Sequence, residues 1–130
     1  MNIDAIASWL KPKLPSYADV RPARSMESDP SDVSSALPVL LLHPWQEIAG
    51  PNLYDATVTQ RVAEQFACVS VCAITDLETR RSELFAALLG AQPPGYEDIV
   101  LYVKGEVVGI SASLIWWRDI YSIGFYRRST

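Results

Sequence analysis

The sequence is poor in the residue types that usually carry catalytic chemistry. Its 130 residues include one histidine, His43, and two cysteines, Cys68 and Cys72. No glycine-rich phosphate loop, nucleophile elbow or dinucleotide-binding fingerprint occurs in it. His43 stands in a leucine-rich segment before a proline, where we expect its ring to hydrogen-bond the backbone rather than to act as a base or a ligand. We therefore predict no catalytic, cofactor-binding or metal-binding residues and no enzymatic activity.

The two cysteines do not have the spacing of a disulfide or a metal site. They lie four residues apart in an apolar segment. On a β-strand that separation is about 13 Å, which is beyond disulfide reach. A zinc site made of His43, Cys68 and Cys72 would also lack a fourth ligand. We expect both cysteines to be reduced thiols in the core of a cytosolic protein.

Positive charge and long apolar runs are scarce as well. The net charge is −4 and the pI is about 4.9, whereas sequence-independent DNA binding requires clustered Lys and Arg. No apolar run approaches the roughly 20 residues of a membrane span. Asp4 stands where a signal peptide carries positive charge, so we expect no export. What the chain does contain, 49% apolar and 20% charged residues, indicates a globular protein.

The segment from Gln60 to Gly90 changes its hydrophobic period half-way. From Phe66 to Ile74 it is almost unbroken apolar and rich in β-branched residues, which predicts a strand buried on both faces. Thr75 and Glu78 form a capping-box pattern, and apolar residues then recur at helical spacing until Gly90 ends the helix. A buried strand followed directly by an amphipathic helix indicates an α/β or α+β domain.

The other expected elements surround this unit. They are, in chain order, a helix at residues 3–10, a brief strand at 20–23, long loops at 24–36 and 46–56 separated by a strand at 38–45, strands at 99–103 and 106–110, and a strand at 114–126. Lys104-Gly105 is predicted to form a tight hairpin turn. Residues 1–130 then form one domain of the α/β (α+β) class. Its single mixed, mostly antiparallel β-sheet is flanked by an N-terminal helix and a central amphipathic helix.

The last predicted strand carries large rings on both faces. Trp116 and Trp117 are adjacent, so on a strand they point to opposite faces. Trp117 falls on the more apolar face, and we assign it to the protomer core. Trp116 shares its face with Arg118 and Tyr126, a mixture that is typical of protein interfaces. We hypothesise that this face meets another chain; a helix packed on each face of the sheet is the alternative.

A half-polar stretch leads into the central strand. Gln60, Arg61 and Glu64 lie between Thr57 and Gln65, and a monomer core does not bury such side chains without partners. Because the stretch runs directly into the buried strand, we predict that these three residues contact another chain. A solvated strand end is the alternative.

The order of these features resembles the tail terminator proteins of long-tailed bacteriophages, the lambda-type family. The likeness begins with the N-terminal helix that ends in a Leu-Pro and with Val58-Thr59-Gln60-Arg61-Val62 before the apolar strand. It continues through the helix end Ala87-Leu88-Leu89-Gly90, the turn Gln92-Pro93-Pro94-Gly95-Tyr96, the Gly105-centred hairpin and the strand around Trp116-Trp117-Arg118-Asp119.

The resemblance implies a small structural α/β domain that needs no cofactor and assembles as a six-membered ring. The ring caps the completed tail tube and presents a surface to the head–neck connector. The expected partners are further copies of the chain, the tail tube protein and the connector (stopper) protein, while DNA passes through without specific binding and no membrane is involved. The expected location is the neck end of the virion tail, after synthesis in the host cytoplasm. The candidate contacts with a protomer or the tube are Gln60, Arg61, Glu64, Trp116, Arg118 and Tyr126.

Two alternative functions remain open from the sequence. The first is another phage neck component, such as a stopper or head–tail adaptor. The second is a small cytosolic enzyme or ligand-binding domain that uses His43 and a carboxylate.

Overall fold

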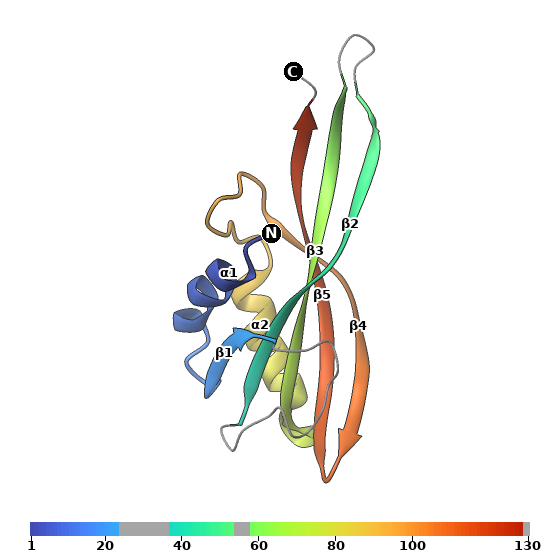
Figure 1. Ribbon diagram of the computed structural model, residues 1–130. Helices are drawn as coiled ribbons and strands as arrows, with labels where there is room; N and C mark the ends of the chain where they lie inside the picture. Colours follow the sequence, from blue (N-terminus) through green and yellow to red (C-terminus); the bar gives the residue numbers. More distant parts are fainter. Residues whose placement is uncertain (24–36, 54–57, 129–130) are drawn as a thin grey trace.

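The computed structural model describes residues 1–23, 37–53 and 58–128 (Figure 1). Its elements, in chain order, are α1 (Ile3–Leu10), the 3-10 turn η1 (Lys11–Lys13), β1 (Asp19–Pro22), β2 (Val39–Asn52), β3 (Thr59–Ala73), the 3-10 turn η3 (Ile74–Asp76), α2 (Leu77–Leu88), β4 (Val100–Ser111) and β5 (Leu114–Arg128). The predicted loop at 24–36 lies outside the described residues.

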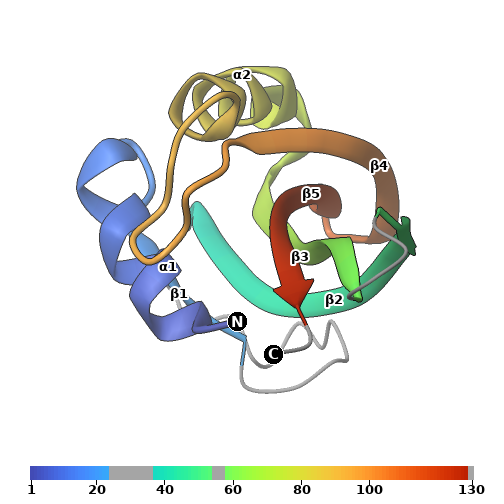
Figure 2. The same cartoon turned by 90° about the horizontal axis from the view of Figure 1, so that it is seen from above.

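The strands form one five-stranded sheet in the order β1-β2-β3-β5-β4. β1 pairs with β2 in parallel, and every other neighbouring pair is antiparallel. Both α-helices lie to one side of this sheet, whose long strands twist and curl (Figures 1 and 2). The mixed, mostly antiparallel sheet with an N-terminal and a central helix confirms the predicted α+β fold.

A main core fills the space between the helices and the sheet. The helices contribute Ile6, Leu10, Leu84 and Leu88, and the facing strands contribute Leu40, Leu42, Phe66, Cys68, Tyr121 and Ile123. Each of these side chains is almost fully buried, and burying a side chain of leucine size stabilises the fold by about 1.5–3 kcal/mol. The short helix α1, which is marginal alone, is therefore held by docking on the sheet.

A second apolar cluster lies on the face of the sheet against which neither α1 nor α2 packs, which we call the helix-free face. It consists of Val39, Val69, Val71 and Trp116, with Leu37, Leu41, Val108 and Leu114 packed around it. Its strand residues alternate with those of the main core, as the two-residue period of a strand requires. The central strands are thus buried on both faces, as predicted, over residues 66–72. The predicted strand ends one residue early, because Ile74 begins the 3-10 turn and is 43% exposed.

Three strands extend beyond the helices as an arm (Figure 1). We define the arm as residues 46–53 of the β2 end, 58–65 of the β3 start and 123–128 of the β5 end. The predicted loop at 46–56 is therefore wrong as far as residue 52, because β2 continues to Asn52. A register shift between Ala49 and Asn52 accommodates Gly50 and Pro51. Residues 54–56 lie outside the described part of the chain.

The hairpin between β4 and β5 turns at Ala112 and Ser113 rather than at Lys104-Gly105. Ala112 and Ser113 both have positive φ, 49° and 68°, as a two-residue turn between antiparallel strands requires. Gly105 lies inside β4 for a different reason. A Cβ there would come within 2.5 Å of the Tyr102 hydroxyl and 2.7 Å of an Asp119 oxygen. Glycine is needed at this position because neighbouring side chains approach its backbone closely. The predicted turn at Lys104-Gly105 is therefore wrong.

The central helix begins later than the capping-box pattern predicts. Residues Ile74–Asp76 form a 3-10 turn, and Asp76 precedes α2 without a side-chain cap bond. The end of the helix agrees with the prediction. Gly90 has φ +75° and donates its N–H to the Val100 carbonyl, so the chain leaves the helix directly toward β4.

Candidate functional site

The arm gathers four of the six residues that the sequence singled out. Gln60, Arg61 and Glu64 lie on its β3 strand, and Tyr126 lies on its β5 strand directly opposite Arg61. Trp116 and Arg118 lie nearer the start of β5, where Trp116 belongs to the second apolar cluster. The structure therefore separates the predicted contact residues into an arm set and a sheet-face set.

The arm exposes a group of large apolar side chains. Ile48, Leu53, Val58 and Tyr126 are each between 49% and 53% exposed. Neither of the two described α-helices packs against this part of the sheet (Figure 1). An exposed apolar group on a projecting element is typical of a surface that another protein covers.

Arg61 anchors one side of the arm root. Its guanidinium donates to Asp98 in the segment that leads into β4, and it crosses Gly124 of β5 to do so. A Cβ on Gly124 would lie only 2.4 Å from Nη2 of Arg61. A hydrogen bond from the backbone N–H of Ile99 and the Arg61 guanidinium both lower the pKa of Asp98.

Glu64 anchors the arm root through the same connecting segment. It accepts a hydrogen bond from the hydroxyl of Tyr96 at 3.1 Å. Burial, together with the neighbouring Glu64 carboxylate, raises the pKa of Tyr96 to about 12. Because Tyr96 and Asp98 precede β4, the connection between α2 and β4 fixes the arm at two points.

Gln60 is also held within the chain. Its amide donates to the Gly50 carbonyl oxygen at 2.9 Å, which links β3 to β2 next to a register shift. The polar side chains that the sequence assigned to a partner thus have intramolecular bonds. They stiffen the arm, while its exposed apolar residues provide area for contact.

A groove of about 810 Å³ lies where the arm meets the connecting segment. Glu64, Tyr96, Asp98, Tyr126 and Arg128 are among its lining residues. Carboxylates, an arginine and aromatic rings line the same wall, so the groove suits a polypeptide segment of mixed polarity.

Trp116 does not occupy the position that the sequence predicted. It is only 3% exposed and packs with Val39, Val69 and Val71. The expectation that Trp116 lies outside the protomer core is wrong, because the sheet buries side chains on both faces. Trp117, which we assigned to the protomer core, is the less buried of the pair and lies on the helix side of the sheet.

Arg118 lies on the helix-free face in a set of stacked contacts. Its guanidinium donates to Glu106 at 2.9 Å and lies 4.4 Å from the ring centre of Trp45. Lys104 approaches the same ring at 5.7 Å. Hydrogen bonding by Arg118 lowers the pKa of Glu106. No sequence pattern pointed to Trp45, which stands at the register shift between Pro44 and Gln46 and has no partner in the register of β2 with β3.

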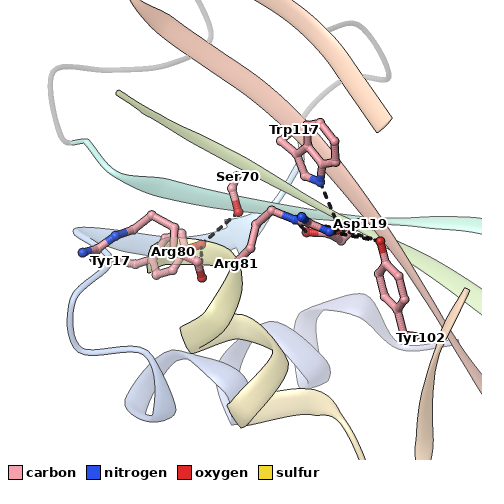
Figure 3. A network of polar contacts seen from close by, with 7 residues as sticks. All are labelled: Tyr17, Ser70, Arg80, Arg81, Tyr102, Trp117 and Asp119. Atoms are coloured by element: carbon pink, nitrogen blue, oxygen red, sulfur yellow. Dashed lines mark hydrogen bonds and ion pairs between the residues drawn. The ribbon is translucent and has the colours of Figure 1, made fainter. Parts of the chain in front are cut away.

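A buried carboxylate connects α2 to β5 (Figure 3). Asp119 is fully buried and accepts hydrogen bonds from Arg81 at 2.9 Å, from the Tyr102 hydroxyl at 3.0 Å and from the Trp117 indole at 3.0 Å. Burial alone lowers the pKa of Arg81, but the bonds and charge of Asp119 outweigh this effect and the pKa is raised. In the sequence, Asp119 is the one acidic residue of a mostly apolar predicted strand. A carboxylate buried in such a strand requires charged donors as partners.

A neighbouring polar contact fixes the chain after α1 (Figure 3). The hydroxyl of Tyr17 lies 2.9 Å from the Ser70 hydroxyl and donates to the Arg80 carbonyl at 3.4 Å. Burial raises the pKa of Tyr17, so the hydroxyl stays protonated and available as a donor. Both polar networks join layers of the fold and have the character of structural contacts.

The residues that were considered for catalysis or metal binding are His43, Cys68 and Cys72, and their contacts are typical of residues with a structural role. Cys68 and Cys72 are free and buried on β3, and burial raises the pKa of both thiols. Nδ1 of His43 lies 2.8 Å from the Pro44 carbonyl oxygen. A carbonyl oxygen only accepts, so this nitrogen carries the proton. Among the described residues, no group of three or more acidic, histidine or cysteine side chains has the geometry of a metal site.

Comparisons with known proteins leave the family unassigned. A scan against protein-family models found no match, and a search of curated proteins found none. No helix in the described ranges is long and apolar enough to cross a membrane.

Proposed function

We propose that the chain is a structural protein that assembles as a six-membered ring, caps the completed tail tube of a long-tailed phage and receives the head–neck connector. The observation that supports this proposal is the arm. It projects from the helix-covered part of the sheet and carries half-exposed Ile48, Leu53, Val58 and Tyr126. A sheet segment without a second layer on it gains stability when another protein supplies that layer.

The arm is built for contact rather than for catalysis. Arg61 and Glu64 fasten its root to Asp98 and Tyr96. A surface that is rigid before binding loses less conformational entropy when a partner covers it. Tyr and Arg are also enriched at protein interfaces, and Tyr126 and Arg61 stand side by side on adjacent strands.

The proposed path for DNA agrees with the charge of the chain. A net charge of −4 does not favour sequence-independent attraction to phosphate. DNA can therefore slide through a ring of such subunits without adhering to it.

The proposal is tested by removing the apolar character of the arm. Ile48 and Val58 are replaced together by Glu, and the protein is expressed with a phage tail tube protein. We expect a folded protein that no longer caps tubes, seen as tubes of uncontrolled length in electron micrographs. Leu89→Glu is the matched control, because Leu89 is 47% exposed and lies outside the arm.

Two results would count against the proposal. The first is capping by the arm variant at the level of the wild type. The second is an arm variant that melts at a much lower temperature than the control, since the arm residues would then belong to the core of the protomer.

A further inference from the structure

The two long edges of the sheet are protected very differently. Beyond its pairing with β1, β2 contains Pro44 and Pro51. β2 and β4 each have two register shifts against their inner neighbours, so the prolines are what distinguishes the two edges. Prolines and bulges are the usual devices that prevent another strand from pairing with an edge. β4 forms the opposite edge, and Figure 1 shows it at the outer side of the sheet with no described strand beyond it.

β4 has no proline in its twelve residues and exposes apolar side chains along its length. Leu101, Val103, Val107 and Ile110 are between 41% and 62% exposed. A long edge strand with unpaired backbone groups and apolar side chains readily pairs with another strand. Prolines therefore block pairing along the β2 edge, and β4 has none.

The centre of β4 is self-complementary in charge. Around Gly105 the order is Val103, Lys104, Gly105, Glu106, Val107, so a basic and an acidic residue flank the glycine and a valine follows on each side. Residues 104–107 pair with β5 without interruption between two register shifts, which gives this stretch regular strand geometry. Both charged side chains lie on the helix-free face, because they stand opposite Ile120 and Arg118.

We propose that β4 pairs antiparallel with β4 of a second copy of this chain, about a twofold axis through Gly105. This register places Lys104 of each copy opposite Glu106 of the other, and Val103 opposite Val107. Directly opposite side chains of an antiparallel pair share a face and lie about 4.5–5.5 Å apart at Cβ. Two ion pairs then form from one self-complementary segment, while Val103 stands at the register shift where the regular ladder ends.

The two charged groups at the proposed contact, Lys104 and Glu106, can each form a further ion pair. Arg118 uses only Oε1 of Glu106, so Oε2 has no hydrogen-bond partner among the described residues. Lys104 contacts the face of Trp45, and its charge also helps to lower the pKa of Glu106 on the same strand. Gly105 lies on the proposed axis, and the fold itself requires glycine there, because the Tyr102 hydroxyl and the Asp119 carboxylate occupy the space of a Cβ.

This twofold contact is separate from the contact that closes a ring. A ring of six requires a heterologous interface, in which different surfaces of neighbouring subunits meet, whereas the β4 contact is isologous. It pairs the β4 edges of two chains. Its test does not depend on the proposed tail function.

A pair of charge reversals tests the proposal without any other protein. Lys104→Glu and Glu106→Lys are purified separately, and each is checked for folding by thermal melting. The wild type should contain a species of twice the 14.4 kDa chain mass by native mass spectrometry. Each variant alone should raise the dissociation constant of that species at least about tenfold, because like charges then face each other twice.

Mixing the two variants distinguishes this register from any other contact. A copy with Glu at both positions and a copy with Lys at both positions restore two attractive pairs, so the mixture should form a heterodimer that neither variant forms alone. Ile48→Lys, on the arm, is the matched control for Val107→Lys, since Ile48 is 50% and Val107 is 52% exposed. Only Val107→Lys should dissociate the dimer. A monomeric wild type, an assembly with unchanged mass in Lys104→Glu, or a mixture that does not associate overturns the proposal.

Discussion

Trp116 and Trp117 are neighbours in the chain, yet they lie in opposite layers of the molecule. Trp116 is in the apolar cluster on the helix-free face, and Trp117 donates its indole N–H to Asp119 on the helix side. Arg81 lies 4.7 Å from the Trp117 ring centre and holds it beside α2. One dipeptide therefore joins both cores of the protein.

This placement predicts unequal effects of removing the two rings. Trp116→Ala leaves a cavity among Val39, Val69 and Val71 and should lower the free energy of unfolding by about 3–5 kcal/mol. Trp117→Ala should cost less, because the ring is partly exposed. Urea unfolding of both variants measures the difference. Equal losses would show that the helix-free cluster contributes no more than the edge of the main core.

Asp119 should be among the most sensitive polar positions. Asp119→Leu leaves Arg81 without its carboxylate partner, and removing one member of a buried pair costs about 3–5 kcal/mol. Replacing Arg81 by Met in the same chain should recover a large part of this loss. The comparison is a double-mutant cycle by chemical denaturation. Glu47→Gln, which breaks an exposed pair with Arg127, is the control and should have little effect.

The buried cysteines predict a loss of stability at alkaline pH. Burial raises the pKa of Cys68 and Cys72 in the folded chain, whereas an unfolded thiol ionises near pH 8.5. Above about pH 8.5 the unfolded chain therefore binds fewer protons than the folded chain, and the free energy of unfolding falls as the pH rises. Between pH 7 and 10, the free energy of unfolding should fall less steeply with pH for Cys68→Ala than for the wild type. Equal slopes would contradict this account.

The attachment of the arm can be loosened without changing any charge. Gly124→Ala places a Cβ against the Arg61 guanidinium and displaces it from Asp98. Because the displaced group is the end of a flexible exposed side chain, overall stability should change little. Amide hydrogen exchange in residues 59–65 should become faster, and tube capping should weaken. Unchanged exchange would mean that Tyr96 and Glu64 hold the arm root alone.

His43 provides a test of the alternative enzymatic function. The ring donates to the Pro44 carbonyl and lies 6.1 Å from the ring of Trp45. Replacing it by Gln keeps a donor in this position, so folding and tube capping should both persist. Loss of capping in a variant that melts like the wild type would reopen the possibility that His43 takes part in chemistry or ligand binding.

Local patterns determined the parts of this protein that depend on neighbouring residues. The apolar run at 66–74, the helical period after it and Gly90 predicted a strand, a helix and the end of that helix. Alternation along residues 114–126 likewise predicted β5 and the opposite directions of its two tryptophans. Side-chain period and backbone conformation are properties of a few consecutive residues, so they can be derived without the rest of the fold.

Only the tertiary structure decided which of these residues contact one another. Gly105 matches a turn in sequence, but it lies in a strand because Asp119, fourteen residues later, brings polar side chains against it. Ala112 and Ser113 carry no turn signal, yet they adopt positive φ because β4 and β5 pair on either side of them. The burial of Trp116 and the projection of the arm depend on how strands distant in sequence align. Strand register and sheet curvature are set by packing across the whole molecule, and no local pattern contains that information.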